Sequence, residues 1–171
     1  MSSREDQEEM FETIVKEEIC PVCLSPAFKI SIRKYSHDKN IYEVLSSCDV
    51  CGFHSFNVFI MGDDIRNKPK RKRVRIEKHS DMDIKIVRSN TASIRIKELG
   101  VEIDPGSAAQ GEIMTVDTLL RKISNIVRAF TNEENKERSE EILTRIRDIR
   151  EKERFEPIHI VLEDPYGDST F

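Results

Sequence analysis

Four cysteines are the residues of this sequence whose types and spacing most clearly indicate chemistry. Cys20 and Cys23 form one Cys-x-x-Cys pair, Cys48 and Cys51 form a second, and the pairs are twenty-four residues apart. Two such turns, brought together by a hairpin, supply the four sulfurs of a tetrahedral Zn²⁺ site. Because four thiolates leave no open position, the pattern predicts one structural zinc per chain rather than a catalytic metal.

Other uses of these thiols remain open from the sequence, because redox-active dithiols, unliganded thiols or two disulfides would need the same residues. Pro21 and Gly52 favour the metal site, since proline fixes φ within the first turn and glycine permits an unusual φ after the second. His54 follows the second pair and is an alternative ligand or a hydrogen-bond donor to a ligand. The remaining histidines are scattered, and we expect them on the surface or in the core: His37, His79 and His159.

The elements that must position the cysteines are strands. Residues 28–35 and 41–46 read as two strands around a polar turn, and residues 53–60 read as an aromatic strand. We therefore expect a zinc-ribbon finger over residues 20–61. Its phenylalanines are either exposed anchors for a partner or residues that pack the finger against the β-rich domain: Phe53, Phe56 and Phe59.

Residues 1–19 form an acidic segment with apolar residues at helical spacing. Met10, Phe11, Ile14 and Val15 would lie on one face of a short helix. Two interpretations are a tail with a short docked helix and an amphipathic segment that binds a partner.

Residues 62–171 predict a β-rich domain with a helical-hairpin insertion, which makes the fold class α+β. Alternation of apolar and polar residues indicates strands at 83–88, 92–97, 101–103 and 157–162. The helices are expected at about 115–154, the first capped by Thr115 and the second opened by a capping box that starts at Thr131. Three i,i+4 ion pairs are expected on the second helix: Glu134–Arg138, Glu141–Arg145 and Asp148–Lys152.

Residues 68–75 are the one dense basic run, Lys-Pro-Lys-Arg-Lys-Arg-Val-Arg. It has three interpretations: a nucleic-acid contact, a contact for an acidic protein surface, and the solvated edge of a sheet. Residues 73–77 alternate as a half-buried strand should, and no aromatic residue interleaves the run to stack on bases.

The overall composition is that of a small, heavily ionic protein. The 171 residues are 37% hydrophobic and 35% charged, and 28 basic and 32 acidic side chains give a formal net charge of −4. This balance excludes a globally basic nucleic-acid binder, although a local basic patch is compatible with it. The apolar runs are far too short to span a bilayer, and no apolar signal segment opens the sequence. We therefore expect a cytoplasmic protein without a membrane contact.

Three segments, in this order, resemble those of the ZPR zinc-finger family ("zinc finger protein one"). They are the cysteine pairs with their long spacer, residues 86–99 followed by Pro105-Gly106, and the terminal run Glu-Asp-Pro-Tyr-Gly-Asp-Ser at 163–169. Residues 111–120 are similar to a further stretch of the family. The combination is specific, above all its closing Asp-Pro-x-Gly-x-Ser pattern. This chain has one finger-plus-domain module, as archaeal relatives do, whereas eukaryotic relatives have two.

The resemblance implies a fold and a partner. The fold is a four-cysteine zinc ribbon followed by a double-stranded β-helix that carries a helical hairpin. The implied partner is translation elongation factor one-alpha, which eukaryotic members bind and help to fold. We therefore expect a zinc-binding, chaperone-like protein-interaction module.

The alternative function is a nucleic-acid-binding zinc ribbon that acts in transcription or translation, supported by the finger and the basic run. An enzyme is not expected, and the sequence predicts neither catalytic residues nor a small-molecule substrate. Asp164 and Asp168 are separated by turn residues and no nucleophile accompanies them. The His-x-Asp/Glu motif of metal oxygenases is not supplied by His37, His54 or His159 either.

Overall fold

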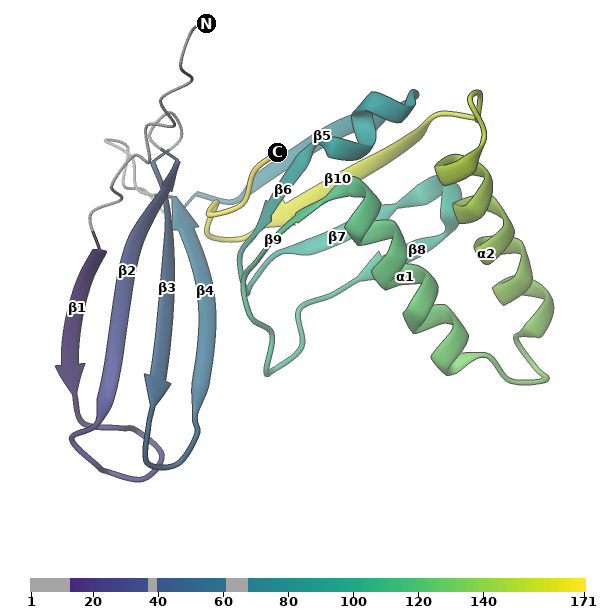
Figure 1. Ribbon diagram of the computed structural model, residues 1–171. Helices are drawn as coiled ribbons and strands as arrows, with labels where there is room; N and C mark the ends of the chain where they lie inside the picture. The colour runs from purple at the N-terminus through teal and green to yellow at the C-terminus, as the bar shows by residue number, and fades with distance from the viewer. Residues whose placement is uncertain (1–12, 37–39, 61–67) are drawn as a thin grey trace, which may run out of the picture. The chain divides into compact units, whose positions relative to one another are not determined.

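The computed structural model describes residues 13–36, 40–60 and 68–171 (Figure 1). The chain splits into two compact units, residues 1–63 and residues 64–171. Among the described residues, no helix is both long enough and apolar enough to cross a membrane.

The first unit is an antiparallel sheet of four strands in the order β1-β2-β3-β4 (Figure 1). The two strands expected between the cysteine pairs are confirmed, and the second continues through Cys48. The aromatic strand is also confirmed and begins at His54. The strands are β1 (Thr13–Glu18), β2 (Phe28–Ser36), β3 (Ile41–Cys48) and β4 (His54–Ile60).

The helix expected before Cys20 is wrong for residues 13–18, which form strand β1; residues 1–12 lie outside the described part of the chain. β1 pairs with β2 along its whole length, and the pairing sets Glu17 opposite Lys29. The edge of β2 offers unpaired backbone groups, and their hydrogen bonds outweigh the weak local helical period. The finger's sheet therefore begins before the first cysteine pair.

The second unit contains two antiparallel sheets. Four strands form one sheet in the order β5-β10-β7-β8, and two strands, β6 and β9, form the other. An isolated bridge between Val87 and Thr170 ties β6 to the end of the chain. The strands are β5 (Lys70–Ile76), β6 (Lys85–Arg88), β7 (Ser93–Ile96), β8 (Val101–Ile103), β9 (Glu112–Thr115) and β10 (Ile158–Asp164); the two 3-10 turns are η1 (His79–Asp83) and η2 (Lys97–Leu99).

Two helices, α1 (Val116–Phe130) and α2 (Lys136–Glu151), form the expected hairpin (Figure 1). Thr115 caps α1 as predicted, because its side-chain oxygen accepts a hydrogen bond from the Thr118 N–H at 3.2 Å. The apolar stripe of α1 is buried from Val116 to Ile123, but Ile126 and Phe130 at its far end are exposed.

The capping box expected at Thr131 is wrong, since α2 begins only at Lys136. The Thr131 hydroxyl instead donates backwards to the Val127 carbonyl at 2.7 Å. The side chains of Asn132 and Asn135 stabilise the connecting turn. The Asn132 Oδ1 accepts hydrogen bonds from the backbone N–H groups of Glu134 and Asn135, and the Asn135 Oδ1 accepts one from the backbone N–H of Asn132.

Of the three expected i,i+4 pairs on α2, the structure shows the pair between Asp148 and Lys152, at 2.8 Å. Arg138 instead contacts Glu141 and donates to the Leu99 carbonyl, and Arg145 donates to the Glu98 carbonyl. These carbonyls lie in η2, where a short turn leaves acceptors without intrahelical partners. The arginines of α2 therefore attach the hairpin to the sheet.

The core of the second unit joins residues from both sheets and from one face of each helix. Its buried members are almost all aliphatic, and they include Ile76, Ile94, Leu120, Ile146 and Ile160. This packing buries much apolar surface and is the main stabilising contribution to the unit.

Candidate metal centre

The first cysteine pair lies in a tight turn between β1 and β2. The Leu24 N–H donates to the Cys20 carbonyl at 3.0 Å, and the Cys20 N–H donates to the Ser25 carbonyl at 2.8 Å. Leu24 has a φ of +60°, the left-handed region that favours glycine.

The second pair repeats this backbone between β3 and β4. The Gly52 N–H donates to the Cys48 carbonyl at 3.0 Å, and the Cys48 N–H donates to the Phe53 carbonyl at 2.8 Å. Gly52 has a φ of +73°, as its position predicted. The equivalent position in the first turn is Leu24, and no sequence pattern predicted that a branched residue would adopt this conformation.

The β2–β3 hairpin brings the two turns together. β2 starts shortly after Cys23 and β3 ends at Cys48, and the register pairs Phe28 directly with Cys48. The strands therefore place both turns at the same end of the sheet, although they lie far apart in the sequence.

The four sulfurs form one compact cluster that fits a tetrahedral metal ion. All ligand atoms of Cys20, Cys23, Cys48 and Cys51 lie within 4.8 Å of one another. The Sγ atoms of Cys20 and Cys51 are 3.7 Å apart, and those of Cys23 and Cys48 are also 3.7 Å apart. A regular tetrahedron with Zn–S bonds of about 2.3 Å has an edge of about 3.8 Å. The cluster therefore has the donor set and the size for a single structural Zn²⁺.

The cluster lies against a small apolar group. Cys20 and Cys48 are buried, Cys23 is half-buried and Cys51 is exposed. The rings of Phe28 and Phe53 pack beside the cysteines with their centroids 6.0 Å apart. Phe53 therefore packs within the finger; that the phenylalanines pack the finger against the β-rich domain stays a prediction.

Hydrogen bonds prepare one thiol for ionisation. Burial raises the pKa of the Cys20 thiol, but backbone N–H groups of Cys23 and Val22 direct hydrogen bonds at its sulfur and lower its pKa to about 7. A backbone hydrogen bond near Ser25 lowers the pKa of Cys23, but burial and the neighbouring sulfurs outweigh it and raise that pKa to about 12. Four adjacent thiolates therefore need a cation to coexist, which Zn²⁺ supplies when it is bound.

The described histidines make other contacts. The Nδ1 of His54 lies 3.3 Å from the Gly52 carbonyl, and the ring is exposed. His79 contacts the Lys152 carbonyl, and His159 contacts Glu98. His37 lies outside the described residues, as does the side chain of Phe59.

Asp164 has a structural role at the end of β10. It is 2% exposed and accepts hydrogen bonds from the Ser89 hydroxyl at 2.8 Å, the Thr91 hydroxyl at 3.0 Å and the Tyr166 N–H at 3.0 Å. The Ser169 hydroxyl donates to it as well. Burial raises the pKa of this carboxyl group, but these hydrogen bonds outweigh burial and hold the pKa below its usual value.

Gly167 completes the same turn with a φ of +77°, and a Cβ atom at this position would lie 2.6 Å from the Lys68 carbonyl oxygen. The terminal Asp-Pro-x-Gly-x-Ser pattern therefore folds the end of the chain against the loop after β6. The fold of this turn therefore explains the pattern.

Comparison with known proteins agrees with this arrangement. Residues 80–171 match the model of the ZPR1 jelly-roll domain. An uncharacterized ZPR1-like protein of Methanocaldococcus jannaschii is 33% identical over 88% of this chain and 77% of its own length. One of Pyrococcus horikoshii is 28% identical over 88% of this chain and 70% of its own length.

Eukaryotic relatives are longer. The zinc finger chaperone zpr1 of Schizosaccharomyces pombe is 29% identical over 61% of this chain, but the match covers only 22% of that protein. The jelly-roll match confirms the β-rich domain with its helical hairpin, and the sulfur cluster in the preceding sheet has the arrangement of a zinc finger. The chain belongs to the ZPR1 family of zinc finger proteins.

Proposed function

We propose that this protein is a zinc-dependent protein-interaction module and a chaperone-like partner of translation elongation factor one-alpha. Its single Zn²⁺ is held by Cys20, Cys23, Cys48 and Cys51. The module binds rather than catalyses, and such a partner places it in the cytoplasm.

The observation that carries this proposal is the set of exposed apolar side chains at the metal-binding turns. Nine large apolar side chains are exposed in the described residues, and four of them lie in or next to these turns: Ile19, Val22, Leu24 and Val50. Clustered apolar exposure of this kind is typical of a protein contact. We call these four residues the turn patch.

Zinc links the turn patch to binding. Val22 and Val50 each precede a cysteine of the cluster, so metal coordination fixes the backbone from which they project. A surface that is ordered before it meets its partner loses less conformational entropy on binding. Zinc therefore supplies the rigidity, and the apolar side chains supply the contact.

The partner itself is inferred from the family. The Schizosaccharomyces pombe relative is named a zinc finger chaperone, which supports a protein client in general terms. Elongation factor one-alpha is the client implied by the family resemblance of the sequence.

The test compares two double variants by calorimetry against purified elongation factor in its nucleotide-free, GDP-bound and GTP-bound states. Val22→Ser with Val50→Ser removes apolar surface at the turns. Val15→Ser with Leu45→Ser removes exposed apolar surface elsewhere on the same sheet. We expect the first variant to bind at least about tenfold more weakly and the second to bind like the parent protein. Both must retain one zinc per chain by elemental analysis.

Two results would contradict the proposal. One is the absence of a complex in every nucleotide state with zinc present, and the other is equal binding by the two variants. The alternative function, a nucleic-acid-binding ribbon, has less support because the basic run lies in β5 of the second unit and not in the finger.

A further inference from the structure

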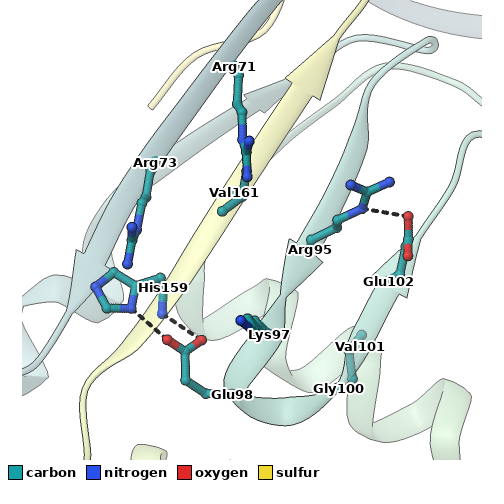
Figure 2. A pocket seen from close by; sticks show the side chains of 10 residues that line it. All are labelled: Arg71, Arg73, Arg95, Lys97, Glu98, Gly100, Val101, Glu102, His159 and Val161. Atoms are coloured by element: carbon teal, nitrogen blue, oxygen red, sulfur yellow. Dashed lines mark hydrogen bonds and ion pairs between the residues drawn. The ribbon is translucent and has the colours of Figure 1, made fainter.

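The outer face of the larger sheet in the second unit contains a basic groove. Its volume is about 650 Å³, and its charged lining comes from β5, β7, η2 and β8 (Figure 2). In the register of the sheet, Val161 of β10 lies opposite Arg73 on one side and Arg95 on the other. Short side chains on the central strand and long basic side chains on its neighbours produce a trough that follows β10.

The dimensions of the trough suit one extended polypeptide segment. β5 and β7 flank β10, and adjacent strands lie about 4.8 Å apart, so the basic walls are about 10 Å apart at the backbone. Figure 2 shows Arg71 and Arg73 on one side of β10 and Arg95 and Lys97 on the other. Cations therefore line both sides of the trough.

The carboxylates of this face are already engaged. Glu98 accepts hydrogen bonds from His159, at Nδ1 (2.6 Å) and at the backbone N–H (3.1 Å). Glu102 pairs with Arg95 at 2.5 Å. Glu163, at the edge of the groove, lies 3.1 Å from Arg71 and 3.2 Å from Arg95. These three carboxylates therefore already pair with His159, Arg71 and Arg95.

Two basic side chains of the groove have no carboxylate partner in the described residues. Within the described residues, the side chains of Arg73 and Lys97 are exposed and make neither an ion pair nor a hydrogen bond. One lies in each wall of the trough, on opposite sides of β10. A ligand with two or more negative charges along an extended chain would complement both at once.

We propose that this groove binds an extended acidic segment of a partner protein, whose carboxylates pair with Arg73 and Lys97. A single-stranded nucleic acid is the less suitable occupant, because no Phe, Tyr or Trp lines the groove to stack on bases, and the one ring that does, His159, is hydrogen-bonded to Glu98. The site is independent of the finger and of the identity of its partner.

The experiment measures fluorescence anisotropy of a fluorescein-labelled octaglutamate peptide with the full, zinc-loaded chain at low salt. We expect saturable binding that weakens as salt is added. The variant Arg73→Gln with Lys97→Gln should bind about tenfold more weakly, since it removes both uncompensated charges. Arg73→Lys with Lys97→Arg keeps the charges and should retain binding.

A matched control removes the same charge elsewhere. Lys136 and Arg147 are exposed on α2 and have no ion pair in the described part of the chain, so replacing both with glutamine changes the net charge equally. We expect this variant to bind the peptide like the parent protein.

Three results would overturn the proposal: no binding of the peptide, an equal loss in the groove and control variants, and no loss in the groove variant. A labelled decauridylate that binds more tightly than the peptide, and loses affinity in the groove variant, would assign the groove to nucleic acid instead.

Discussion

The finger and the second unit reach a fixed structure by different means. The buried apolar group beside the metal site contains Cys20, Phe28 and Cys48, with only a few half-buried neighbours. The second unit has a continuous aliphatic core from two sheets and two helices. The finger's sheet also buries Glu43, which is 5% exposed and pairs with Arg33. Two further apolar side chains of this sheet, Ile41 and Val58, are buried. Apolar packing therefore dominates the second unit and is sparser in the finger.

This difference indicates which unit needs the metal in order to fold. Folding must offset the conformational entropy of every ordered residue, and a small apolar group cannot do so alone. In the finger, metal coordination has to supply the missing free energy. In the second unit, burial of aliphatic side chains suffices, so the two units should respond differently to the same treatment.

Removal of zinc should have the largest effect and should be confined to the finger. A structural zinc site contributes on the order of 10 kcal/mol of apparent folding free energy. We expect a strong chelator, or Cys48→Ser with Cys51→Ser, to unfold residues 13–60 while the second unit stays folded. Two-dimensional NMR checks this, because signals of β2 and β3 should collapse while those of α1 and β10 persist. If the NMR signals of both units persist without metal, the finger does not depend on zinc for its fold and the contrast between the units is wrong.

Truncation in the aliphatic core should have the converse effect. Leu120 is fully buried in the second unit, and Leu120→Ala should lower its free energy of unfolding by about 2–5 kcal/mol. Denaturant unfolding followed by the helical circular dichroism signal measures this loss. Zinc content by elemental analysis should stay at one per chain, since the finger does not depend on this core. A coupled loss of zinc would show that the units fold together.

Asp164 offers a smaller effect with a defined pH dependence. Asp164→Asn places an N–H group where hydroxyl and amide donors converge, and should destabilise the second unit by about 2 kcal/mol. The folded-state pKa lies below the usual 3.8, so the carboxylate's contribution is fully present above 3.8 and is lost as pH falls through the folded-state value. Unfolding curves recorded over acidic pH should show this loss in the parent protein and a flatter dependence in the variant.

Much of both units could be predicted from local pattern. Alternation located β2 and β3, the cysteine spacing predicted the sulfur cluster, and Thr115 marked the start of α1. The incorrect predictions share one cause: contacts with residues far away in the sequence determine the local structure. β1 depends on the edge of β2, and the arginines of α2 bond to carbonyls of η2 instead of to their own helix.

The groove illustrates the same limit. The sequence showed that residues 73–77 alternate as a half-buried strand does, and the structure places residues 73–76 in β5 with alternating burial. It could not show that β10 lies between β5 and β7, and only that order sets Arg73 and Lys97 on opposite sides of Val161. Register between distant strands is set by packing of the whole sheet, and a single sequence does not reveal it.

The smallest expected change in stability concerns the two metal-binding turns of the finger, which should respond oppositely to substitution. Leu24 and Gly52 occupy equivalent positions with φ near +60° and +73°, but only glycine adopts this region without steric cost. Leu24 is 75% exposed, so its side chain gains little from packing. Leu24→Gly should therefore stabilise the zinc-bound finger by up to about 1 kcal/mol, and Gly52→Ala should destabilise it by about 1 kcal/mol. Competition with a chromophoric chelator measures both as shifts in zinc affinity, because an easier turn lowers the cost of assembling the site. If Leu24→Gly keeps its zinc affinity but weakens partner binding, Leu24 serves the turn patch, and the strained conformation is retained for contact rather than for the metal.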